Sequence, residues 1–508
     1  MPDLQRRNVR LPRLALMPPM LAALVLALVA CSTVGPDFVK PVPAAPDDWT
    51  SWRSADESLR QPPGAGLPVP TPWWTAFRDP LLDSLQQEAL AASPDLYTAA
   101  LRFAQARVQR GVADAQRGPE LGLSAGLSQQ RQSEYGASTR MFDVIGGNRQ
   151  ALARFLSQPF TLHQAGFDAS WEPDLWGRVR RSLEAADADL GSQAALADLA
   201  RLSVTSELAR AYADLRTTQR LLELAREDVS ALRERLDIVQ ARVRGGALDS
   251  LDLERQRAEL AALQAQLPGL LAQEGALVNQ IGLLLDKPPG ALREVLAAAG
   301  NSARPALPDL ALGLPSEVAL RRPDIRAAEA RLHRATANIG VARAALYPSI
   351  RLGARLGFES YLSGEFADWG SRVWSVGPSL NLPLFDHGRR QRVVQLRELE
   401  QQEAAVAYHQ TVRKAWQDID DALSAYAAEQ QQARALEARV ASAANAFELI
   451  QARYRGGSTD YTAVLDGRRG LLQARRDLWA SEGRLATRFV AVNKALGNGP
   501  HGEARSAD

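Results

Sequence analysis

The 508-residue chain contains very little cysteine and histidine, with one cysteine and five histidines. A single cysteine excludes an intrachain disulfide framework and a zinc site built from cysteine thiolates. The histidines are scattered and show no ligand spacing such as HExxH. We therefore expect no metal and no bound cofactor.

The chain also lacks an excess of charge of either sign. Sixty lysines and arginines oppose 58 aspartates and glutamates, which leaves a formal net charge of +2. This balance gives no electrostatic footprint for nucleic acid, so we expect no nucleic-acid partner. With 46% hydrophobic and 23% charged residues, the composition is that of an ordered protein. No P-loop motif is present, and we do not expect an enzyme.

Long hydrophobic runs are missing after residue 30, where no segment has eighteen consecutive apolar residues. A second helical membrane span is therefore excluded. Residues 1–30 are typical of a signal peptide, because four arginines precede an apolar run, Leu14–Ala30, that contains two prolines. The run leads into the tetrapeptide LVAC, which resembles a bacterial lipobox ending at Cys31. We expect Cys31 to carry diacylglycerol and an acyl chain; the alternative is a signal peptide with an incidental cysteine.

Ser32 follows this cysteine, where an aspartate would resemble an inner-membrane retention signal, so we expect a lipoprotein of the outer membrane. Residues 31–75 contain nine prolines and lack helical or strand periodicity. This composition predicts an extended, acylated tether. The aromatic residues Trp73, Trp74 and Phe77 then mark the start of packed structure, as a hydrophobic anchor.

The chain contains an internal repeat. The heptapeptide QARVRGG at residues 240–246 recurs as QARYRGG at residues 451–457, and the dipeptide Pro-Asp at 94–95 recurs at 323–324. The first pair is separated by 211 residues and the second pair by 229. The difference of 18 residues predicts an insertion in the first copy, in a loop of the 128–159 region. We expect four segments after the tether: a first repeat at 76–287, a connecting segment at 288–320, a second repeat at 321–497 and a polar tail at 498–508.

Each repeat is expected to contain a helix, two strands and a long helical hairpin. The first helix should begin at Pro94, with Ser93 as its N-cap, and end near Pro119. Residues 174–267 and 384–499 contain no proline and are rich in good helix formers. They predict helices of about 67 residues, roughly 100 Å long at 1.5 Å per residue. Such helices must pack along partner helices.

Paired glycines predict where these long helices end. Gly245-Gly246 and Gly456-Gly457 can adopt the left-handed conformation that terminates a helix, so hairpin tips are expected near 245 and 456. Asp249 or Ser250 and Thr459 or Asp460 are candidate caps of the returning helices.

Four segments of about ten residues alternate apolar residues with small or polar ones, in β-hairpins expected near 119–174 and 348–384. This pattern is typical of transmembrane β-strands. A soluble two-sheet layer is the alternative for any single hairpin, but four such segments behind an outer-membrane anchor favour the membrane. The polar faces carry four charged residues that we expect to line a water-filled lumen: Asp168, Arg351, Arg355 and Glu359.

Four strands cannot close a barrel alone, and lipid does not tolerate unpaired strand edges. The fold class is therefore expected to be an oligomeric transmembrane β-barrel, continued by a long α-helical periplasmic barrel of coiled-coil hairpins. Two chains would supply eight strands, and three would supply twelve strands with room for a lumen. The residues alone leave this stoichiometry open.

Three motifs resemble those of a known family. They are the CSTVGPDF segment from Cys31, the WW pair at 73–74 with FRDPL at 77–81, and GLPS at 313–316 with RRPDI at 321–325. Together they resemble the lipoprotein outer membrane factors of the NodT/OprM type, which are related to TolC. The resemblance covers essentially the whole chain after residue 30. It implies a homotrimer with a twelve-stranded barrel and a twelve-helix tunnel.

The resemblance also implies a function and partners. Family members act as passive exit ducts of tripartite efflux systems, with a periplasmic adaptor protein and an inner-membrane pump, here expected to be of the RND type. Two alternatives stay open. The same duct could serve type I protein secretion, or the chain could be a structural lipoprotein that spaces the envelope, although a spacer has no use for amphipathic strands.

The resemblance places an aperture gate at the second hairpin tip. Asp466 falls on the inner of two aspartate positions that ring the closed aperture in related proteins, while Ala463 occupies the outer one. Asp252 matches an aspartate that pairs with a tip tyrosine, here Tyr454. The alternatives are a solvated surface carboxylate for Asp466 and a helix-dipole partner for Asp252.

The tips themselves are expected to dock the adaptor. The candidate residues are the arginines and glycines at the two helix ends: Arg242, Arg244, Gly245, Gly246, Arg453, Arg455, Gly456 and Gly457. Their ordinary role, in which glycines end helices and arginines complement the C-terminal dipoles, is compatible with docking.

Overall fold

The computed structural model describes residues 33–43, 45–60, 72–136, 149–246, 248–298 and 315–500. The signal peptide, Cys31, residues 313–314 of the family motif and most of the polar tail lie outside the described residues. The chain divides into two compact units. Unit 1 comprises residues 1–39, 108–187 and 333–402, and unit 2 comprises 40–107, 188–332 and 403–508.

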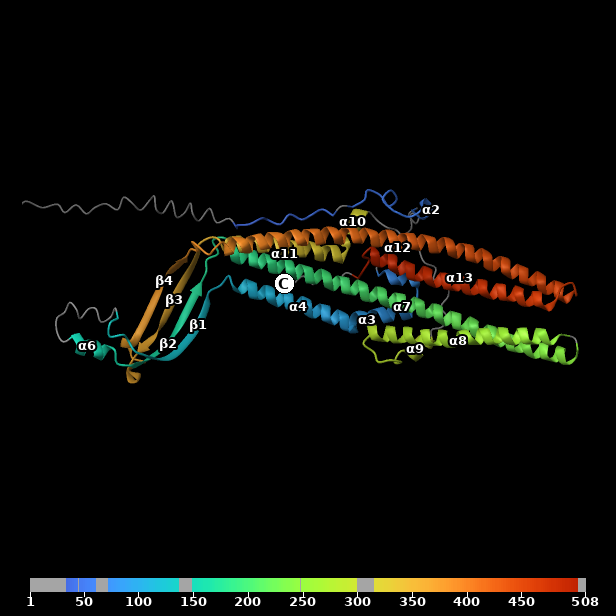
Figure 1. Cartoon of the computed structure of the whole chain (residues 1–508), viewed down its shortest axis with the longest axis horizontal. Coiled ribbons are helices and arrows are strands. Elements are labelled where there is room, and N and C mark those ends of the chain that lie inside the picture. The colour runs from blue at the N-terminus through green and yellow to red at the C-terminus, as the bar shows by residue number, and fades with distance from the viewer. Residues whose placement is uncertain are drawn as a thin grey trace, which may run out of the picture. The chain divides into compact units, whose positions relative to one another are not determined.

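The helices confirm the internal repeat (Figure 1). Three pairs have identical lengths in the two copies. Helices α4 (Pro94–Ala115) and α11 (Pro323–Ala344) have 22 residues each. Helices α7 (Arg178–Arg244) and α12 (Arg389–Arg455) have 67 residues, and α8 (Ser250–Leu284) and α13 (Tyr461–Ala495) have 35. Shorter elements join them: α2 (Glu57–Arg60), η1 (Trp73–Phe77), α3 (Pro80–Ala92), α6 (Arg149–Leu156), α9 (Arg293–Ala298), α10 (Pro315–Arg321), η3 (Ser363–Glu365) and η4 (Trp369–Ser371).

The turns at the hairpin tips follow the predicted chemistry. Gly246 and Gly457 have φ values of 69° and 73°, a left-handed conformation that suits glycine. Asp249 caps α8 by accepting a hydrogen bond from the Leu251 amide. Asp460 caps α13 by accepting one from the Ala463 amide at 2.9 Å. Both caps satisfy amides that the first helical turn leaves unpaired.

One local feature differs from expectation. Ser93 does not cap α4, because its buried hydroxyl has no hydrogen-bond partner among the described residues. Its amide donates to the Ala89 carbonyl instead, so the chain passes from α3 to α4 through backbone hydrogen bonds. Pro268 lies inside α8, which continues through it to Leu284.

The four strands form one antiparallel sheet in unit 1, in the order β1-β2-β3-β4. They are β1 (Glu120–Gln130), β2 (Phe160–Trp171), β3 (Ser349–Ser360) and β4 (Arg372–Asn381). Among the described strands, β1 and β4 each have one neighbour, so each leaves one edge unpaired. The apolar face is largely open: Leu123, Trp374 and Val376 are 70 to 73% exposed.

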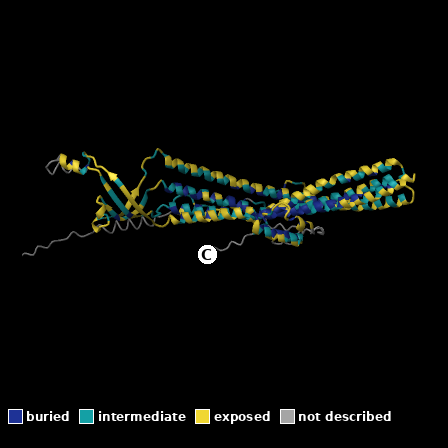
Figure 2. Ribbon diagram, turned by 90° about the horizontal axis from the view of Figure 1, so that it is seen from below, coloured by how far each residue is buried: buried dark blue, intermediate teal, exposed yellow. Residues whose placement is uncertain are grey.

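The main hydrophobic core lies in unit 2 and confirms the predicted aromatic anchor. Trp73 and Trp74 are buried, and the rings of Trp73 and Phe77 contact Phe489 of α13. Buried residues of α3, α7, α8, α9, α10, α12 and α13 complete this cluster. Figure 2 shows buried residues gathered on the helices, whereas the strands are exposed or intermediate along most of their length.

Several residues of the family motifs make specific packing and polar contacts. In unit 1, Asp37 binds Arg181 of α7 at 2.6 Å, and a Cβ on Gly35 would lie 2.5 Å from the Cα of Gly340. In unit 2, buried Arg322 donates to the Ala495 carbonyl and to Asp324. These contacts explain why an aspartate, a glycine and an arginine stand at these positions.

Part of the predicted tether is packed. The N-terminal strap, defined here as residues 45–60, lies against α12 in unit 2. Trp49 and Trp52 meet the ring of Trp416 edge-on, at 6.4 and 5.5 Å between centroids. Arg53 donates to Asp420 at 3.0 Å, and the two side chains are 1% and 9% exposed. The strap was expected to be part of an extended tether, but contacts between partly buried tryptophans and this ion pair hold it against α12.

None of the helices that the structure describes is both long enough and apolar enough to span a membrane.

We predict that Asp420→Asn releases the strap at a cost of about 3–5 kcal/mol, because it leaves the Arg53 guanidinium buried without a countercharge. The Arg53→Met, Asp420→Leu double variant removes both charges and should recover most of this loss. Chemical unfolding measures the loss of stability, and the rate of tryptic cleavage at Arg60 measures the release of the strap. Equal losses in the single and double variants would contradict the ion-pair assignment.

The same contact predicts an acid dependence. Burial opposes ionisation of Asp420, but hydrogen bonds from Ser54 and the charge of Arg53 outweigh it and lower the pKa below its ordinary 3.8. A lowered folded-state pKa stabilises the strap above pH 3.8, and this contribution disappears as the pH falls through the folded-state value.

Candidate functional site

The charged residues predicted for the lumen share the polar face of the sheet. Asp168 of β2 lies directly opposite Arg355 of β3, and their charged groups are 3.8 Å apart. Gln164 donates to Glu359 at 2.7 Å across the same strand pair. The face therefore carries both signs of charge close together, as a polar surface exposed to water would.

Arg351 lies at the end of this face nearer to the helices. Its guanidinium is 3.6 Å from Glu172, which also accepts two hydrogen bonds from Arg178 at the start of α7. Trp176 stacks on Tyr347 beside it and donates to the Pro348 carbonyl. This polar and aromatic cluster joins the strands of unit 1 to its helices.

Residues 122–126, GLSAG, match the G-x-S-x-G pattern of serine hydrolases. The structure places them in the middle of β1, not at a strand-to-helix turn. Ser124 donates to Asp168 at 2.7 Å. The motif is thus part of the alternating strand pattern, in which glycine and serine form the polar face.

The second group of predicted residues meets in unit 2, where the two helical hairpins lie side by side. Hydrogen bonds join α8 to α13 at positions that differ by 210 residues, Glu259 with Arg469 and Gln266 with Arg476. This spacing almost equals the repeat offset of 211, and the two pairs are seven residues apart. Equivalent faces of the two copies therefore contact each other with heptad-like periodicity.

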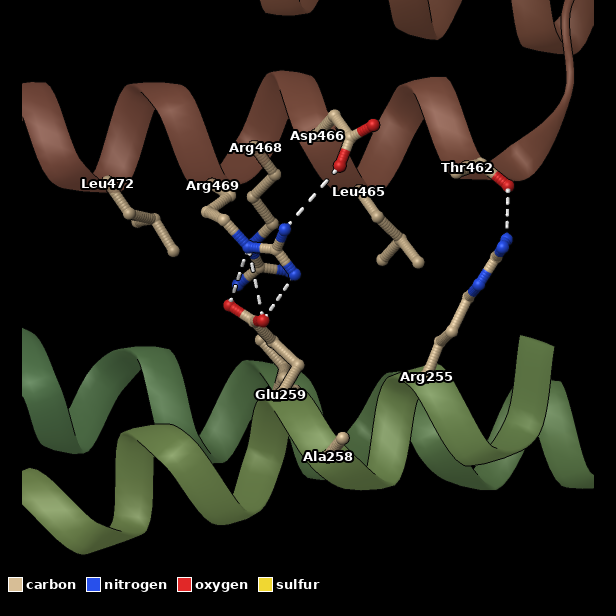
Figure 3. Close-up of a pocket in the computed structure, with 10 residues that line it drawn as sticks. Arg255, Ala258, Glu259, Thr462, Leu465, Asp466, Arg468, Arg469 and Leu472 are labelled. Carbon is tan, nitrogen blue, oxygen red and sulfur yellow. Dashed lines mark hydrogen bonds and ion pairs between the residues drawn. The ribbon is translucent and has the colours of Figure 1, made fainter. Parts of the chain in front are cut away.

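A groove of about 450 Å³ between the hairpins contains the predicted gate residue Asp466 (Figure 3). The Asp466 side chain is 65% exposed, and its carboxylate lies 3.6 Å from Arg469 on the next helical turn. Arg469 also binds Glu259 of α8 through its Nε and Nη2 atoms. Hydrogen bonding to Glu259 raises the pKa of Arg469, so this arginine stays charged.

Asp466 therefore belongs to a three-residue cluster, Glu259–Arg469–Asp466, that sequence reasoning missed. The sequence of either helix alone does not reveal this cluster, because Glu259 and Arg469 are neighbours only once α8 lies against α13. The cluster places one positive charge between two negative ones. An Asp466 ring would thus be less repulsive than the isolated carboxylates predict.

Within the described single chain, the residues of the predicted Asp252–Tyr454 pair each contact another residue, so the pairing stays a prediction. The Tyr454 hydroxyl accepts a hydrogen bond from Arg242 at 2.8 Å, and its ring contacts Tyr461. Asp252 lies 4.0 Å from Arg255, three residues further along α8. Arg242 reaches Tyr454 because both residues lie in the last turn of their helices. Asp252 in the first turn of α8 is consistent with the dipole alternative.

The predicted docking residues lie at the two tips and are exposed. They are Arg242, Arg244, Gly245, Gly246, Arg453, Arg455, Gly456 and Gly457. Gly246 and Gly457 have open space around the position of a Cβ, so only their positive φ requires glycine. The last-turn arginines also complement the helix dipoles, as expected.

We predict that Asp466→Ala raises single-channel conductance, because the shorter side chain widens the expected constriction, and lowers cation preference, because it removes one negative charge per chain. Arg469→Ala should also raise conductance, since it breaks the Glu259 link between the hairpins, whereas Arg469→Lys should keep most of that link. Planar-bilayer recordings of the three variants measure this. Unchanged conductance in both alanine variants would remove the gate assignment from this cluster.

The family model described as outer membrane efflux protein matches residues 85–283 and 314–498. The pyoverdine export outer membrane protein OpmQ of Pseudomonas putida is 33% identical over 94% of this chain and 97% of its own length. Outer membrane protein OprJ of Pseudomonas aeruginosa is 31% identical over 88% of this chain and 89% of its own.

The solved structure of the outer-membrane channel OprN superposes with a TM-score of 0.79 at 29% identity, covering 92% of this chain and 99% of that one. The likeness thus extends over the sheet, the helical hairpins and the helices between them.

Proposed function

The chain belongs to the outer membrane efflux protein family, and we propose that it forms the exit duct of a tripartite efflux system in the outer membrane. The observation that carries this proposal is the four-stranded sheet with one polar face, one open apolar face and two unpaired edges. No single chain can place such a sheet in lipid. Several copies can, if β4 of one chain pairs with β1 of the next.

The proposed assembly is a homotrimer with twelve strands. The apolar face then meets outer membrane lipid, and the face with Asp168, Arg351, Arg355 and Glu359 lines the lumen. Eight strands from a dimer would fill the interior with side chains, whereas twelve leave room for a channel. The helical hairpins of the three chains would continue the channel as a twelve-helix tunnel in the periplasm.

The duct is expected to be passive and to depend on partners. A periplasmic adaptor would contact the hairpin tips, and an inner-membrane pump of the RND type would supply energy and select cargo. OpmQ is named for pyoverdine export. Its similarity to this chain favours small-molecule efflux over protein secretion. A spacer lipoprotein is disfavoured, because a spacer does not need an amphipathic sheet.

The anchor completes the proposal. Acylation of Cys31 would fix the start of the mature chain in the outer membrane, and residues 33–39 follow it onto unit 1. No catalytic role is proposed for any residue, and no cofactor is proposed besides the covalent lipid on Cys31.

The test uses the purified full chain in detergent. We expect a species of three chains that persists on gels without heating and dissociates on heating, with circular dichroism showing both helix and strand. The same material should produce discrete ion-conducting steps in planar bilayers. A monomer that inserts into no bilayer would contradict the duct and return the spacer alternative.

A further inference from the structure

Two grooves adjoin between the helical hairpins of unit 2. One is the groove around Asp466, and the other, of about 370 Å³, is lined by residues nearer to the helix ends. Leu232 and Arg235, one turn apart on α7, line the first and the second groove respectively. On α13, Arg468 lines the first groove and Val464, one turn before it, lines the second. Arg235 and Arg468 therefore project between the same two helices, one from each copy of the repeat.

The positive charges of these two arginines interact. Burial, and then the neighbouring charge of Arg235, lower the pKa of Arg468. The Nη1 atom of Arg235 is buried and has no hydrogen-bond acceptor among the described residues. A guanidinium donor buried without an acceptor is costly, and a second positive charge beside it adds repulsion. An anion between the two groups would relieve both costs.

The carboxylates near this pair are engaged by other arginines. Glu259 and Asp466 contact Arg469. The buried carboxylate of Asp228 interacts with three arginines of α13: Arg468, Arg475 and Arg476. One negative charge is thus shared among three positive ones, and in the part of the chain that the structure describes none of these acids forms an ion pair with Arg235.

A buried carboxamide supplies a further donor. The Gln256 side chain is 0% exposed, and neither its Nε2 nor its Oε1 atom has a hydrogen-bond partner among the described residues. Its counterpart in the second copy, Gly467, lies against Ile450, because a Cβ on that glycine would be 2.8 Å from the Ile450 Cδ1 atom. The same pairing in the first hairpin places Gln256 against Val239, one turn from Arg235. Its NH₂ group can donate to an anion that Arg235 also binds.

These unpartnered groups occur in one copy of the repeat only. The residue that corresponds to Arg235 in the second copy, 211 positions later, is Ala446, and the one that corresponds to Gln256 is Gly467. The contacts that the two hairpins share therefore do not require either side chain. Helix-dipole complementarity does not explain Arg235 either, because this residue lies more than two turns before the end of α7.

We propose that Arg235, Arg468 and the Gln256 carboxamide bind one small inorganic anion, such as chloride, between the two hairpins. The anion replaces repulsion between α7 and α13 by attraction of both helices to a common charge. It also gives the Nη1 atom of Arg235 and the Nε2 atom of Gln256 an acceptor, and hydrogen bonds to a charged partner are the stronger ones. A water molecule would supply an acceptor but would not offset two positive charges. The inference concerns contacts within one chain and does not depend on the proposed function.

A small monovalent ion suits this place better than a larger anion. Val239 and Val464, which line the groove beside the arginines, are buried aliphatic residues. They offer no hydrogen bonds to the additional oxygen atoms of phosphate or of an organic acid. A halide needs only the donors that the two arginines and the carboxamide provide.

The position of the anion is tested by X-ray diffraction from crystals of the full chain grown with bromide in place of chloride, because bromide scatters anomalously. We expect an anomalous peak within hydrogen-bond distance of the guanidinium groups of Arg235 and Arg468. A site that holds water only would give no such peak, and this result would overturn the inference.

Binding in solution is tested by the linewidth of the chloride NMR signal, with the full chain in detergent. The native protein should broaden the signal in a saturable way, and added bromide should reverse the broadening. Gluconate at the same ionic strength should not reverse it, because this anion is too large for the site and charge screening depends on ionic strength rather than on ion identity.

Matched variants assign the binding to this place. Arg235→Gln and Arg468→Gln should each weaken chloride binding at least about tenfold, and Gln256→Met, which removes the donor and keeps the length of the side chain, about threefold. Arg233→Gln is the control, because Arg233 is exposed on α7 and lines neither groove. It should leave chloride binding unchanged. Far-ultraviolet circular dichroism checks that each variant is folded.

Two results in solution would also overturn the inference. One is the absence of saturable broadening by the native protein. The other is an equal loss of broadening in Arg235→Gln and Arg233→Gln, which would indicate an ion held loosely by surface charge. If a variant does not fold, the bromide position in the native protein decides. Trimer and conductance measurements are unaffected by either result, so the proposed function is tested separately.

Discussion

Backbone amide and carbonyl groups at the edge of a β-sheet need hydrogen-bond partners, and lipid offers none. This constraint governs the sheet of unit 1. Its apolar face is open and its outer strands, β1 and β4, have free edges in the chain. Either the sheet stays out of the membrane, which leaves an unusually large apolar surface in water, or several copies close it. Closure gives the edge groups hydrogen-bond partners and allows the apolar face to contact lipid.

The internal duplication also allows the helices of several chains to form a closed assembly. Identical lengths of α7 and α12, and of α8 and α13, give two equivalent hairpins per chain. Contacts such as Glu259 with Arg469 join the equivalent faces of the two copies. A ring can therefore be built from one repeated type of contact. The two copies also differ, for example in Arg235 of the first copy and Ala446 at the equivalent position of the second. Such differences can carry functions that the repeated contacts do not.

The sequence predicted those features that depend on local chemistry. Glycines with positive φ at the tips, aspartate caps and alternating strand residues follow rules that act over a few residues, and the repeat register set the helix lengths. Long-range polar contacts were not predictable in this way. Arg53 and Asp420 are 367 residues apart, and the residues around Arg53 do not reveal its partner. Ser93 had the expected residue type for a cap, but backbone hydrogen bonds carry the chain from α3 into α4, and the Ser93 hydroxyl caps neither helix.

The candidate site was predicted only in part, because its side-chain contacts are long-range. Residue types and the repeat located Asp466 and the tip arginines, but a pairing such as Arg242 with Tyr454 depends on how two hairpins lie against each other. The sequence prediction also overestimated the negative charge at Asp466, because the nearby Arg469 partly neutralises it.

Pairing of β1 with β4 between chains is the central claim, and disulfide trapping tests it most directly. Cysteines are introduced in pairs, one on β1 at Ser124 or Ser128 and one on β4 at Ser375 or Ser379, in the full-length protein. Oxidation should yield covalent dimers and trimers and no larger species for at least one register, and none for a matched pair that places the second cysteine on the central strand β2 at Ser170. A ladder that stops at dimers, one that extends beyond trimers, or crosslinks confined to single chains would contradict the closed twelve-stranded assembly.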